Sequence, residues 1–409
     1  MKVEIIAVGN EIITGKTINT NASYIAKQIQ DIGLTPLYHS AVVDDREHIK
    51  TALKNGLEKA DIIIFTGGLG PTEDDLTKEA VCEYLNRPLV LYEDIWKEIK
   101  EYFTKTQRET PKSNKKQAYF PSDCTIIPNP NGTAPGALLN HEEKFIIILP
   151  GPPREVNPML DDFVIPYFRK RIEGVYNTLD IKVFGLGESH LVEMIPDLLG
   201  IFENVEVASY IGNYEIIIRI RSFGETQEEA KKNGKEIEKK LYNRLGEYII
   251  GYNDNKLEET ILQLLIKNNY TIATAESCTG GLLAGTLVNC SGISSYFKEG
   301  VVSYSNEAKE KYLGVRKETL EKYGAVSTQT AREMAEGIKK AAGADIGLST
   351  TGIAGPDGGT AQKPVGLVYI GLAIGEECYV YELNLQGNRQ VIREKTVKNS
   401  LYHLYKQLN

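Results

Sequence analysis

The residues with the clearest chemical potential follow a short β-branched segment, Thr271 to Ala275, in the last third of the chain. The next six residues read ESCTGG, which is typical of a corner between a strand and a helix. A hydroxyl at such a corner lies beside free backbone N–H groups that can stabilise an oxyanion. Ser277 is therefore a candidate nucleophile, although Ser277 or Thr279 could instead cap the helix.

A serine nucleophile needs a base, and the choice of bases is small. The only histidine after residue 253 is His403, on a C-terminal amphipathic helix that we expect to lie far from the strand ends, so a Ser-His-Asp triad is not expected. Lys309 falls near the start of a helix that follows a strand ending at Tyr304, where the helix dipole depresses the pKa of an amine. The alternative is a solvated lysine in the charged run EAKEK. Cys278, the competing nucleophile, is interpreted as a packed small residue.

Two glycine-rich loops follow other predicted strands. STTGIAGPDGGTAQKPVG, which begins at Ser349, could direct successive backbone N–H groups at an anion. DIIIFTGGLGPTEDDLT, which begins at Asp61, is neither a Walker loop nor a G-x-G-x-x-G fingerprint. Its glycines allow close approach to phosphates and its carboxylates suit a divalent ion bridging a diphosphate. Asp74 and Asp75 could also be simple charges at a helix N-terminus.

Length and composition bound the class of protein. The 409 residues carry 47 Lys and Arg against 55 Asp and Glu, a formal net charge of −8. This length predicts two or three compact units, and the lack of a basic run argues against a nucleic-acid partner. The five scattered cysteines indicate a reducing compartment. No stretch approaches the ~20 apolar residues that span a bilayer, so we expect a cytoplasmic protein without a membrane partner.

The elements expected around these residues form three parts. Residues 1–170 alternate strands and helices, which predicts a parallel sheet flanked by helices, with the ligand loops at the carboxyl ends of the strands. Residues 171–252 predict a small α+β module, a spacer or dimerisation unit, with a turn at Gly212 and Asn213. Residues 253–409 predict a second α/β domain. The expected strands are Val3–Val8, Thr35–Val43, Asp61–Thr66, Phe145–Leu149, Thr271–Ala275, Gly300–Tyr304, Ile346–Thr350 and Val365–Ala373.

The motifs ESCTGG, VVSYSNEAK, GAVS and GIAGPDGG with KPVG resemble the C-terminal domain of the CinA family, nicotinamide mononucleotide deamidases. The resemblance implies a Ser-Lys dyad, with Ser277 as nucleophile, Lys309 as general base and Tyr304 orienting Lys309 or the substrate amide. It also implies that Thr279 and the glycines after it supply oxyanion donors, and that this domain needs no cofactor. The predicted substrate-binding residues are Glu276, Thr279, Gly280, Gly281, Gly352, Gly355, Asp357 and Gly358.

GNEIITG, NTN, GGLGPTEDD, NPNGTAPG and LPGPPRE are similar to the N-terminal domain of the same family, a relative of molybdopterin-binding domains. This resemblance implies a metal-dependent ADP-ribose pyrophosphatase. We place a divalent metal of unknown identity on Asp75 and Asp44. The predicted nucleotide-binding residues are Glu11, Asn21, Gly67, Gly68, Gly70, Thr72, Asp74, Asn131, Pro150 and Gly151.

The combined prediction is a bifunctional enzyme of pyridine-nucleotide recycling, with two α/β sandwich domains joined by a small α+β module. One domain would hydrolyse nicotinamide mononucleotide to nicotinate mononucleotide and ammonia, and the other would hydrolyse ADP-ribose to AMP and ribose 5-phosphate. The family further implies a homodimer. The alternative is a nucleotide-sensing adaptor with little turnover, linked to competence or DNA damage.

Overall fold

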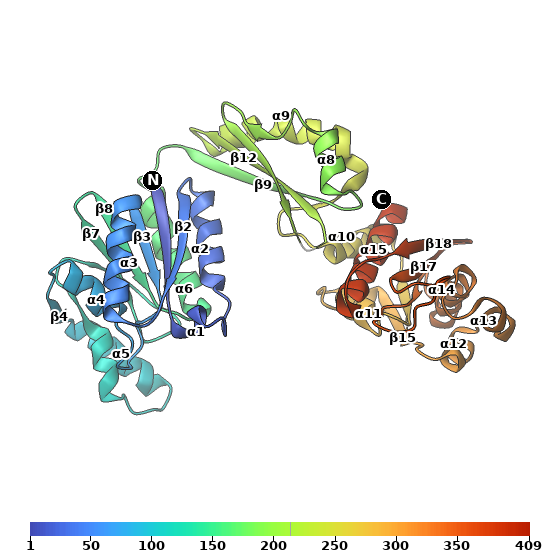
Figure 1. Cartoon of the computed structure of the whole chain (residues 1–409), viewed down its shortest axis with the longest axis horizontal. Helices are drawn as coiled ribbons and strands as arrows, with labels where there is room; N and C mark the ends of the chain where they lie inside the picture. The colour runs from blue at the N-terminus through green and yellow to red at the C-terminus, as the bar shows by residue number, and fades with distance from the viewer. Residues whose placement is uncertain (213) are drawn as a thin grey trace. The chain divides into compact units, whose positions relative to one another are not determined.

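A computed structural model describes residues 1–212 and 214–409, so the predicted turn residue Asn213 lies outside the described part (Figure 1). By its internal contacts the chain divides into two compact units. One unit holds residues 1–177 and 222–233, and the other holds residues 178–221 and 234–409. The division passes through the predicted middle module, so the boundaries after residues 170 and 252 stay predictions.

The N-terminal sheet is mixed, whereas the sequence predicted a parallel one. Its strand order is β2-β1-β3-β8-β7-β6. The first four strands are parallel to one another, and β7 and β6 add an antiparallel edge beside β8. The strands are β1 (Lys2–Val8), β2 (Thr35–Val42), β3 (Ile62–Thr66), β8 (Lys144–Leu149), β7 (Gly136–His141) and β6 (Thr125–Ile127). Strand β6 has only three residues, and the apolar residues of β7 are consecutive, so alternation of apolar and polar residues did not reveal these strands.

Strand β3 shows why helices cover both faces of this sheet. Ile62 and Ile64 pack into one core cluster, while Ile63 and Phe65 pack into the other. Because successive side chains of a strand point to opposite faces, an unbroken apolar strand needs cover on both sides. Helices α2 (Thr20–Asp31) and α6 (Pro153–Met159) cover the first face, and α3 (Arg46–Lys59) and α4 (Thr77–Tyr84) cover the second.

The remaining elements of the N-terminal unit are helices and a separate two-stranded antiparallel sheet, in which β4 pairs with β5. Helix α1 follows β1, and α5 is followed by a short helix η1 that leads into β5. These elements are α1 (Asn10–Ile13), β4 (Leu89–Leu91), α5 (Glu93–Lys105), η1 (Lys112–Ala118), β5 (Tyr119–Pro121), η2 (Leu160–Val164) and α7 (Ile165–Arg169).

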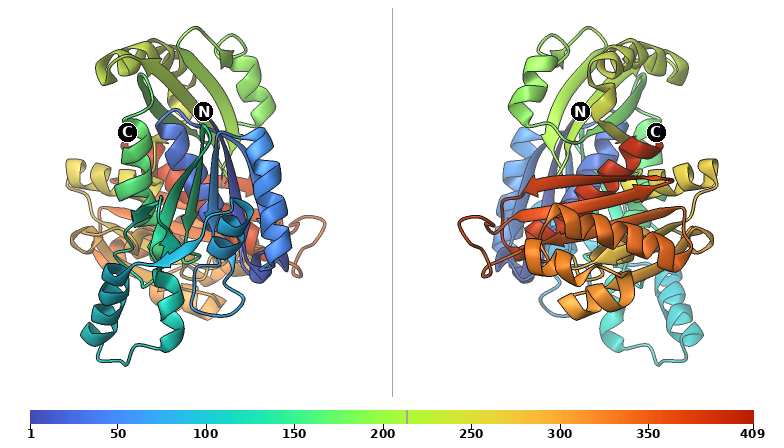
Figure 2. Two further views of the ribbon diagram at one scale, coloured as in Figure 1. Left: turned by 90° about the vertical axis from the view of Figure 1, so that its left-hand side faces the viewer. Right: turned by 90° about the vertical axis from the view of Figure 1, so that its right-hand side faces the viewer.

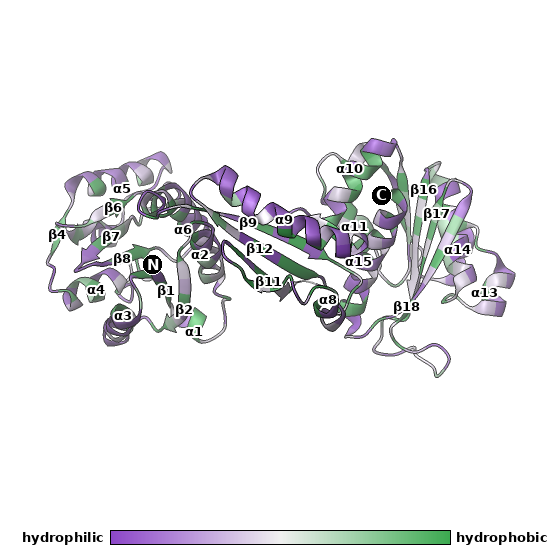
Figure 3. Cartoon of the chain, turned by 90° about the horizontal axis from the view of Figure 1, so that it is seen from above, coloured by the Kyte–Doolittle hydropathy of each residue, from purple (hydrophilic) through white to green (hydrophobic). Residues whose placement is uncertain are grey.

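The middle module contains a five-stranded sheet in the order β10-β11-β12-β9-β13. Strand β12 alternates buried and partly exposed residues along its length, as expected for a sheet with one covered face. Figure 3 shows apolar residues along β11 and β12, whereas α9 is largely hydrophilic. The elements are β9 (Val175–Val183), α8 (Glu188–Met194), β10 (Gly200–Ile201), β11 (Val205–Ile211), β12 (Ile216–Gly224), α9 (Gln227–Leu245), η3 (Gly246–Tyr248) and β13 (Ile249–Tyr252).

The C-terminal sheet has the order β15-β14-β16-β17-β18. Strand β14 lies between two parallel neighbours, and β17 and β18 form an antiparallel hairpin beside β16. Residues at the end of β14 therefore have a neighbouring strand on each side. The strands are β14 (Ile272–Glu276), β15 (Phe297–Val302), β16 (Ile346–Gly352), β17 (Leu367–Ile374) and β18 (Glu377–Asn384).

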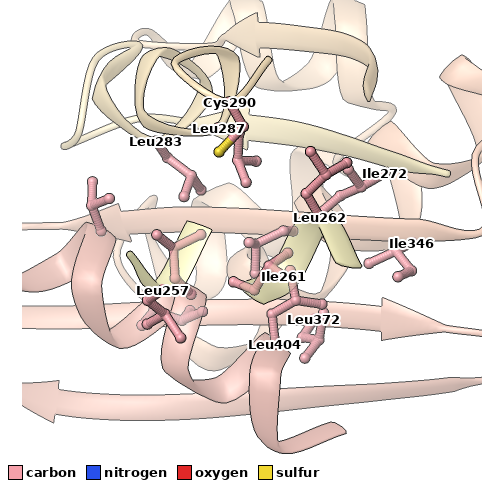
Figure 4. Close-up of a cluster of buried hydrophobic side chains, with 14 of the residues drawn as sticks. Leu257, Ile261, Leu262, Ile272, Leu283, Leu287, Cys290, Ile346, Leu372 and Leu404 are labelled. Carbon is pink, nitrogen blue, oxygen red and sulfur yellow. The ribbon is translucent and has the colours of Figure 1, made fainter. Parts of the chain in front are cut away.

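Helices cover both faces of this sheet. Helix α14 (Thr328–Ala342) crosses one face (Figure 2, right), and α10 (Leu257–Asn268), α11 (Leu282–Val288) and α15 (Arg389–Leu408) cover the other. Figure 4 shows the core of the second face, where Leu257, Ile261 and Leu262 meet Leu283 and Leu404. The remaining helices are η4 (Ile293–Ser295), α12 (Asn306–Leu313) and α13 (Lys317–Tyr323).

Most expected strands are present, with ends that differ by up to three residues. The predicted strand Gly300–Tyr304 is the largest departure, because β15 begins at Phe297 and ends at Val302. Ser303 and Tyr304 lie beyond the strand, and their carbonyl groups turn toward a lysine of the next helix. Among the described residues, no helix is both long and apolar enough to cross a membrane.

Candidate functional site

Ser277 occupies the first position after β14, at the carboxyl edge of the C-terminal sheet. Its backbone N–H donates to the carbonyl of Thr350 on β16 at 2.9 Å, which extends the pairing of the two strands by one residue. The side chain is only 9% exposed. Pairing with β16 therefore holds the backbone of Ser277, and this fixes the direction in which its hydroxyl leaves the sheet.

Lys309 reaches this hydroxyl from helix α12. Ser305 caps the helix, because its hydroxyl accepts from the N–H of Ala308, and Lys309 follows one turn later. The side chain is 1% exposed, and its Nζ lies 3.1 Å from Ser277 Oγ. The amine also donates to the carbonyl of Ser303 at 2.8 Å and to that of Tyr304 at 3.3 Å. Burial lowers the pKa of Lys309, which favours the uncharged amine.

Glu276 has a different place from the substrate contact that was predicted. Its carboxylate is 1% exposed and accepts three backbone N–H groups, from Gly281 at 3.0 Å, Leu283 at 2.9 Å and Ala284 at 2.8 Å. Glu276 thus caps helix α11, and neither Ser277 nor Thr279 does so. The N–H of Gly281 is already used and is not a free oxyanion donor.

Cys278 and Thr279, the two residues after Ser277, contribute to the packing of the fold. Burial raises the pKa of Cys278 to about 12, so its thiol stays protonated and is a poor nucleophile. The hydroxyl of Thr279 lies 2.7 Å from that of Thr350, fully inside the fold.

His403 stacks on Tyr381 at a ring separation of 3.6 Å, and burial lowers the pKa of His403 to about 4.

Two arginines of helix α15 contact loops around this site, Arg393 at the corner itself and Arg389 at the second glycine-rich loop, and the sequence analysis missed both. Arg393 donates to the carbonyl of Thr279 at 2.6 Å, and Arg389 donates to the carbonyl of Gly355 at 2.7 Å. Arg389 also donates to the phenol of Tyr304 at 3.1 Å. The Tyr304 side chain is 62% exposed, so its carbonyl, and not its phenol, is what touches Lys309. Their spacing in the sequence was a usable signal, because Arg389 and Arg393 are four residues apart and therefore share one face of helix α15.

The second glycine loop is only partly directed at this corner. Gly352 ends β16 and Gly355 is buried at a φ of 77°, where a Cβ atom would meet the Val365 side chain at 2.7 Å. Asp357 and Gly358 are exposed. Lys363, the lysine of this loop, donates to two backbone carbonyls, those of Tyr323 and Val326.

In the N-terminal unit, most predicted residues line one cavity of about 400 Å³ at the carboxyl edge of the sheet. Gly67 and Gly68 have φ values of 103° and 65°. A Cβ atom at Gly67 would lie 2.1 Å from the Val8 carbonyl oxygen, so only glycine fits at this close crossing of two loops. The predicted residues that line the cavity are Glu11, Asp44, Gly67, Gly68, Gly70, Asp74, Asp75, Pro150 and Gly151.

Negative charges accumulate in this cavity. Burial raises the pKa of Asp44, and the nearby carboxylates of Glu11, Asp74 and Asp75 raise it further, although the Asn10 N–H at 2.8 Å opposes the shift. Repulsion among these groups favours a bound cation. Lys116 lies nearby, but its amine donates to the carbonyls of Thr72 and Asp75.

Three predicted residues are not among those that line the cavity. Asn21 donates to the Gly151 carbonyl at 2.7 Å and so supports the cavity wall. Thr72 is hydrogen-bonded through both its N–H and its hydroxyl to Asp75. Asn131 donates to the Arg154 carbonyl at 2.8 Å. These side chains shape the loops around the cavity instead of facing into it.

The residues chosen for a metal, Asp44 and Asp75, both line the cavity. Within the described part of the chain, no three His, Cys, Asp or Glu side chains are grouped as a metal-binding cluster. Magnesium usually takes only one or two protein carboxylates together with phosphate oxygens. Asp44 and Asp75 therefore suit an ion that is also bound by a phosphate. They do not suit an ion whose ligands all come from the protein.

Gln117 and Glu155 also line this cavity and were not predicted as site residues. Gln117 donates to the Leu69 carbonyl at 3.1 Å, and Glu155 accepts from Asn129 at 2.7 Å. Glu155 belongs to the LPGPPRE motif, which was a usable signal. Gln117 lies in η1, more than forty residues after the glycine loop, where nothing in the local sequence marks it.

The fold and the two sites define a chain whose N-terminal α/β domain has a cavity lined by glycines and carboxylates, and whose C-terminal α/β domain holds a buried Ser-Lys pair. Three family descriptions match the chain. They are "Probable molybdopterin binding domain" at residues 4–170, "Damage-inducible protein CinA KH domain" at 179–251 and "CinA C-terminal domain" at 254–408.

Relatives match over nearly the whole length. A competence-damage inducible protein of Clostridium novyi strain NT is 49% identical over 408 residues, covering 100% of this chain and 99% of the relative. One of Acetivibrio thermocellus is 49% identical over 400 residues, covering 98% and 97%. A crystal structure of CinA from Thermoplasma acidophilum is 36% identical and covers 40% of this chain and 95% of its own, with a TM-score of 0.38. The chain belongs to the CinA family of competence-damage inducible proteins.

Proposed function

We propose that the C-terminal domain hydrolyses the carboxamide of nicotinamide mononucleotide to nicotinate mononucleotide and ammonia. The observation that carries the proposal is the 3.1 Å separation between Lys309 Nζ and Ser277 Oγ in a buried setting. Hydrogen-bond reach between nucleophile and base is the geometric requirement for an activated serine.

The surroundings of Lys309 suit a general base. A neutral amine has two N–H groups and one lone pair. The carbonyls of Ser303 and Tyr304 can accept the two N–H groups, which leaves the lone pair for the hydroxyl proton of Ser277. Lys309 would take this proton as Ser277 Oγ attacks the carboxamide carbon.

The remaining steps use backbone groups and water. The N–H groups of Thr279 and Gly280 are the proposed oxyanion donors, since that of Gly281 is bonded to Glu276. Lys309 then returns the proton to the leaving nitrogen, and ammonia departs from an acyl-enzyme. A water molecule, deprotonated by the same amine, would hydrolyse the ester and regenerate Ser277.

We propose for the N-terminal domain the hydrolysis of ADP-ribose to AMP and ribose 5-phosphate. What supports it is the convergence of glycine backbone and carboxylates on one cavity. The diphosphate would lie over Gly67 to Gly70, with Asp44 and Asp75 facing a divalent ion. Such an ion, when bound, neutralises phosphate charge and polarises the phosphorus centre. The chain's own residues would position the diphosphate so that a water molecule bonds to one phosphorus atom while the bridging P–O bond breaks, which gives AMP and ribose 5-phosphate.

One experiment tests both activities in the full-length protein. Purified wild-type chain is incubated with nicotinamide mononucleotide, and separately with ADP-ribose and Mg²⁺, while ammonia and AMP are followed. Ser277→Ala should abolish ammonia release and leave AMP release unchanged. Ammonia release that survives in Ser277→Ala would exclude the dyad. Binding of either nucleotide without any turnover would favour the sensing adaptor.

A further inference from the structure

Helix α15 contacts the middle module along one side. Four of its side chains follow one another at a spacing of four residues, which places them in one row on the helix surface. This row consists of Glu394, Lys398, Tyr402 and Lys406, and its partners in the module are, in the same order, Tyr214, Glu215, Phe184 and Glu247. All eight residues belong to the same compact unit of the chain. The helix therefore bears on the module over most of its length.

The first turns of the same helix reach the corner that carries Ser277. Arg393 directly precedes Glu394 of the row and donates to the carbonyl of Thr279 at 2.6 Å. Arg389, one turn earlier, donates to the carbonyl of Gly355 at 2.7 Å. Helix α15 thus contacts both the middle module and the loop whose N–H groups are the proposed oxyanion donors.

The contacts nearest to these arginines come from the hairpin between β11 and β12. Lys398 Nζ lies 2.6 Å from the carboxylate of Glu215, and the two side chains are only 20% and 11% exposed. An ion pair shielded in this way is screened by salt less than a pair on the surface. The phenol of Tyr214 donates to the carboxylate of Glu394 at 2.6 Å.

The backbone of Tyr214 supports the importance of these contacts. Its φ of 65° lies in the left-handed region, which a bulky residue seldom adopts. The ring of Tyr214 nevertheless packs against the core of the C-terminal domain. An unfavourable backbone conformation persists only where the surrounding contacts compensate for it, and here the packed ring and the phenol hydrogen bond do so.

We propose that Tyr214 and Glu215 are positioning residues for the Ser277 corner and act on it through helix α15. By holding Glu394 and Lys398 they would fix the first turns of the helix, and so keep Arg393 on the Thr279 carbonyl. This inference rests on the proposed C-terminal function, and it adds two residues of the middle module that set the geometry of the oxyanion donors.

The test compares variants of the full-length chain. The double variant Tyr214→Phe/Glu215→Gln removes the phenol and the charge but keeps the ring and the size of both side chains, so the fold should persist. Glu215→Lys/Lys398→Glu reverses the ion pair. The matched control is Asp197→Asn, which breaks an ion pair with Arg244 inside the middle module, 2.9 Å long. Arg393→Met removes the last link of the proposed route.

Two readouts separate positioning from a purely structural role. One is amide hydrogen exchange of residues 279–285, and the other is kcat and KM for ammonia release from nicotinamide mononucleotide. Both are measured well below the unfolding midpoint of each variant. A purely structural role would lower that midpoint and leave both readouts unchanged.

We expect exchange of residues 279–285 in the double variant to be faster by between about twofold and about thirtyfold, the range for changes along a coupling route. Arg393→Met should show the same direction of change. The value of kcat should fall over the same range with a smaller change in KM, because misplaced oxyanion donors weaken binding of the transition state most. The reversed pair and Asp197→Asn should behave like the wild type.

Several results would overturn the inference. These are unchanged exchange in the double variant, an equal change in Asp197→Asn, unchanged exchange in Arg393→Met, or no recovery in the reversed pair. Because exchange needs no turnover, the proposed function can fail separately. If exchange responds as expected but the wild type releases no ammonia, the positioning of the corner stands and the deamidase proposal fails. If the wild type releases ammonia and the double variant keeps its exchange and kcat, the deamidase stands and this inference fails.

Discussion

Lys309 Nζ and Ser277 Oγ lie 3.1 Å apart, although their positions in the sequence are 32 residues apart. One side chain leaves the end of strand β14 and the other leaves the first turns of helix α12, beyond the neighbouring strand β15. The parallel pairing of β14 with β15 brings these two segments to the same edge of the sheet.

Replacing either member of this pair should remove deamidation. Ser277→Ala and Lys309→Met should each lower kcat for nicotinamide mononucleotide by at least about a thousandfold, with a small change in KM, because both groups act in the chemical step. The measurement is steady-state ammonia release. Cys278→Ala is the matched control and should keep activity, since its buried thiol is protonated.

The pH profile should report the lowered pKa of Lys309. A base must be neutral, so kcat/KM should rise as pH passes upward through that pKa and then level off. Because burial lowers this pKa, the plateau should begin well below the pH at which an ordinary lysine loses its proton. Lys309→Arg should be inactive throughout, because a guanidinium stays charged. A profile that is flat from about pH 5 to about pH 10 would contradict this assignment.

Glu276 should matter for the stability of the fold. Glu276→Ala removes the acceptor for three buried or partly buried N–H groups, and we expect a loss of about 2–4 kcal/mol in the free energy of unfolding. Thermal or denaturant unfolding of the full chain checks this. Glu299→Ala, an exposed carboxylate on β15, should change stability by less than about 0.5 kcal/mol. Equal effects of the two changes would show that the Glu276 cap is unimportant.

The N-terminal carboxylates should affect only the other reaction. Asp75→Asn or removal of divalent ions with a chelator should abolish AMP formation from ADP-ribose and leave ammonia formation from nicotinamide mononucleotide intact. The reason is that the two candidate sites lie in different compact units of the chain. Lys97→Ala on helix α5 is the matched surface change. If both activities fall together in Asp75→Asn, the sites are not independent.

Local sequence signals predicted the position of Ser277 and Lys309 because each follows a strand at a helix start, and such corners are visible in a short window. The same signals could not assign Glu276, whose partners are backbone groups five to eight residues later and whose burial depends on the packed helix α11. Arg389 and Arg393 were missed because their contacts are made across the tertiary fold. In the N-terminal unit the glycines and carboxylates were found. Strand β6 was missed because it has only three residues, and β7 because its apolar residues are consecutive and do not alternate with polar ones.

The capping of α11 by Glu276 closes that helix end to a second anion. The phosphorylated substrate that we propose for Ser277 would therefore need positive charge in another part of the molecule. The guanidinium of Arg393, 114 residues after Thr279, already holds the loop that such a ligand would approach. The docking of the last helix thus holds a corner made much earlier in the chain, and we expect a truncation that removes α15 to disturb this corner even when Ser277 and Lys309 are kept.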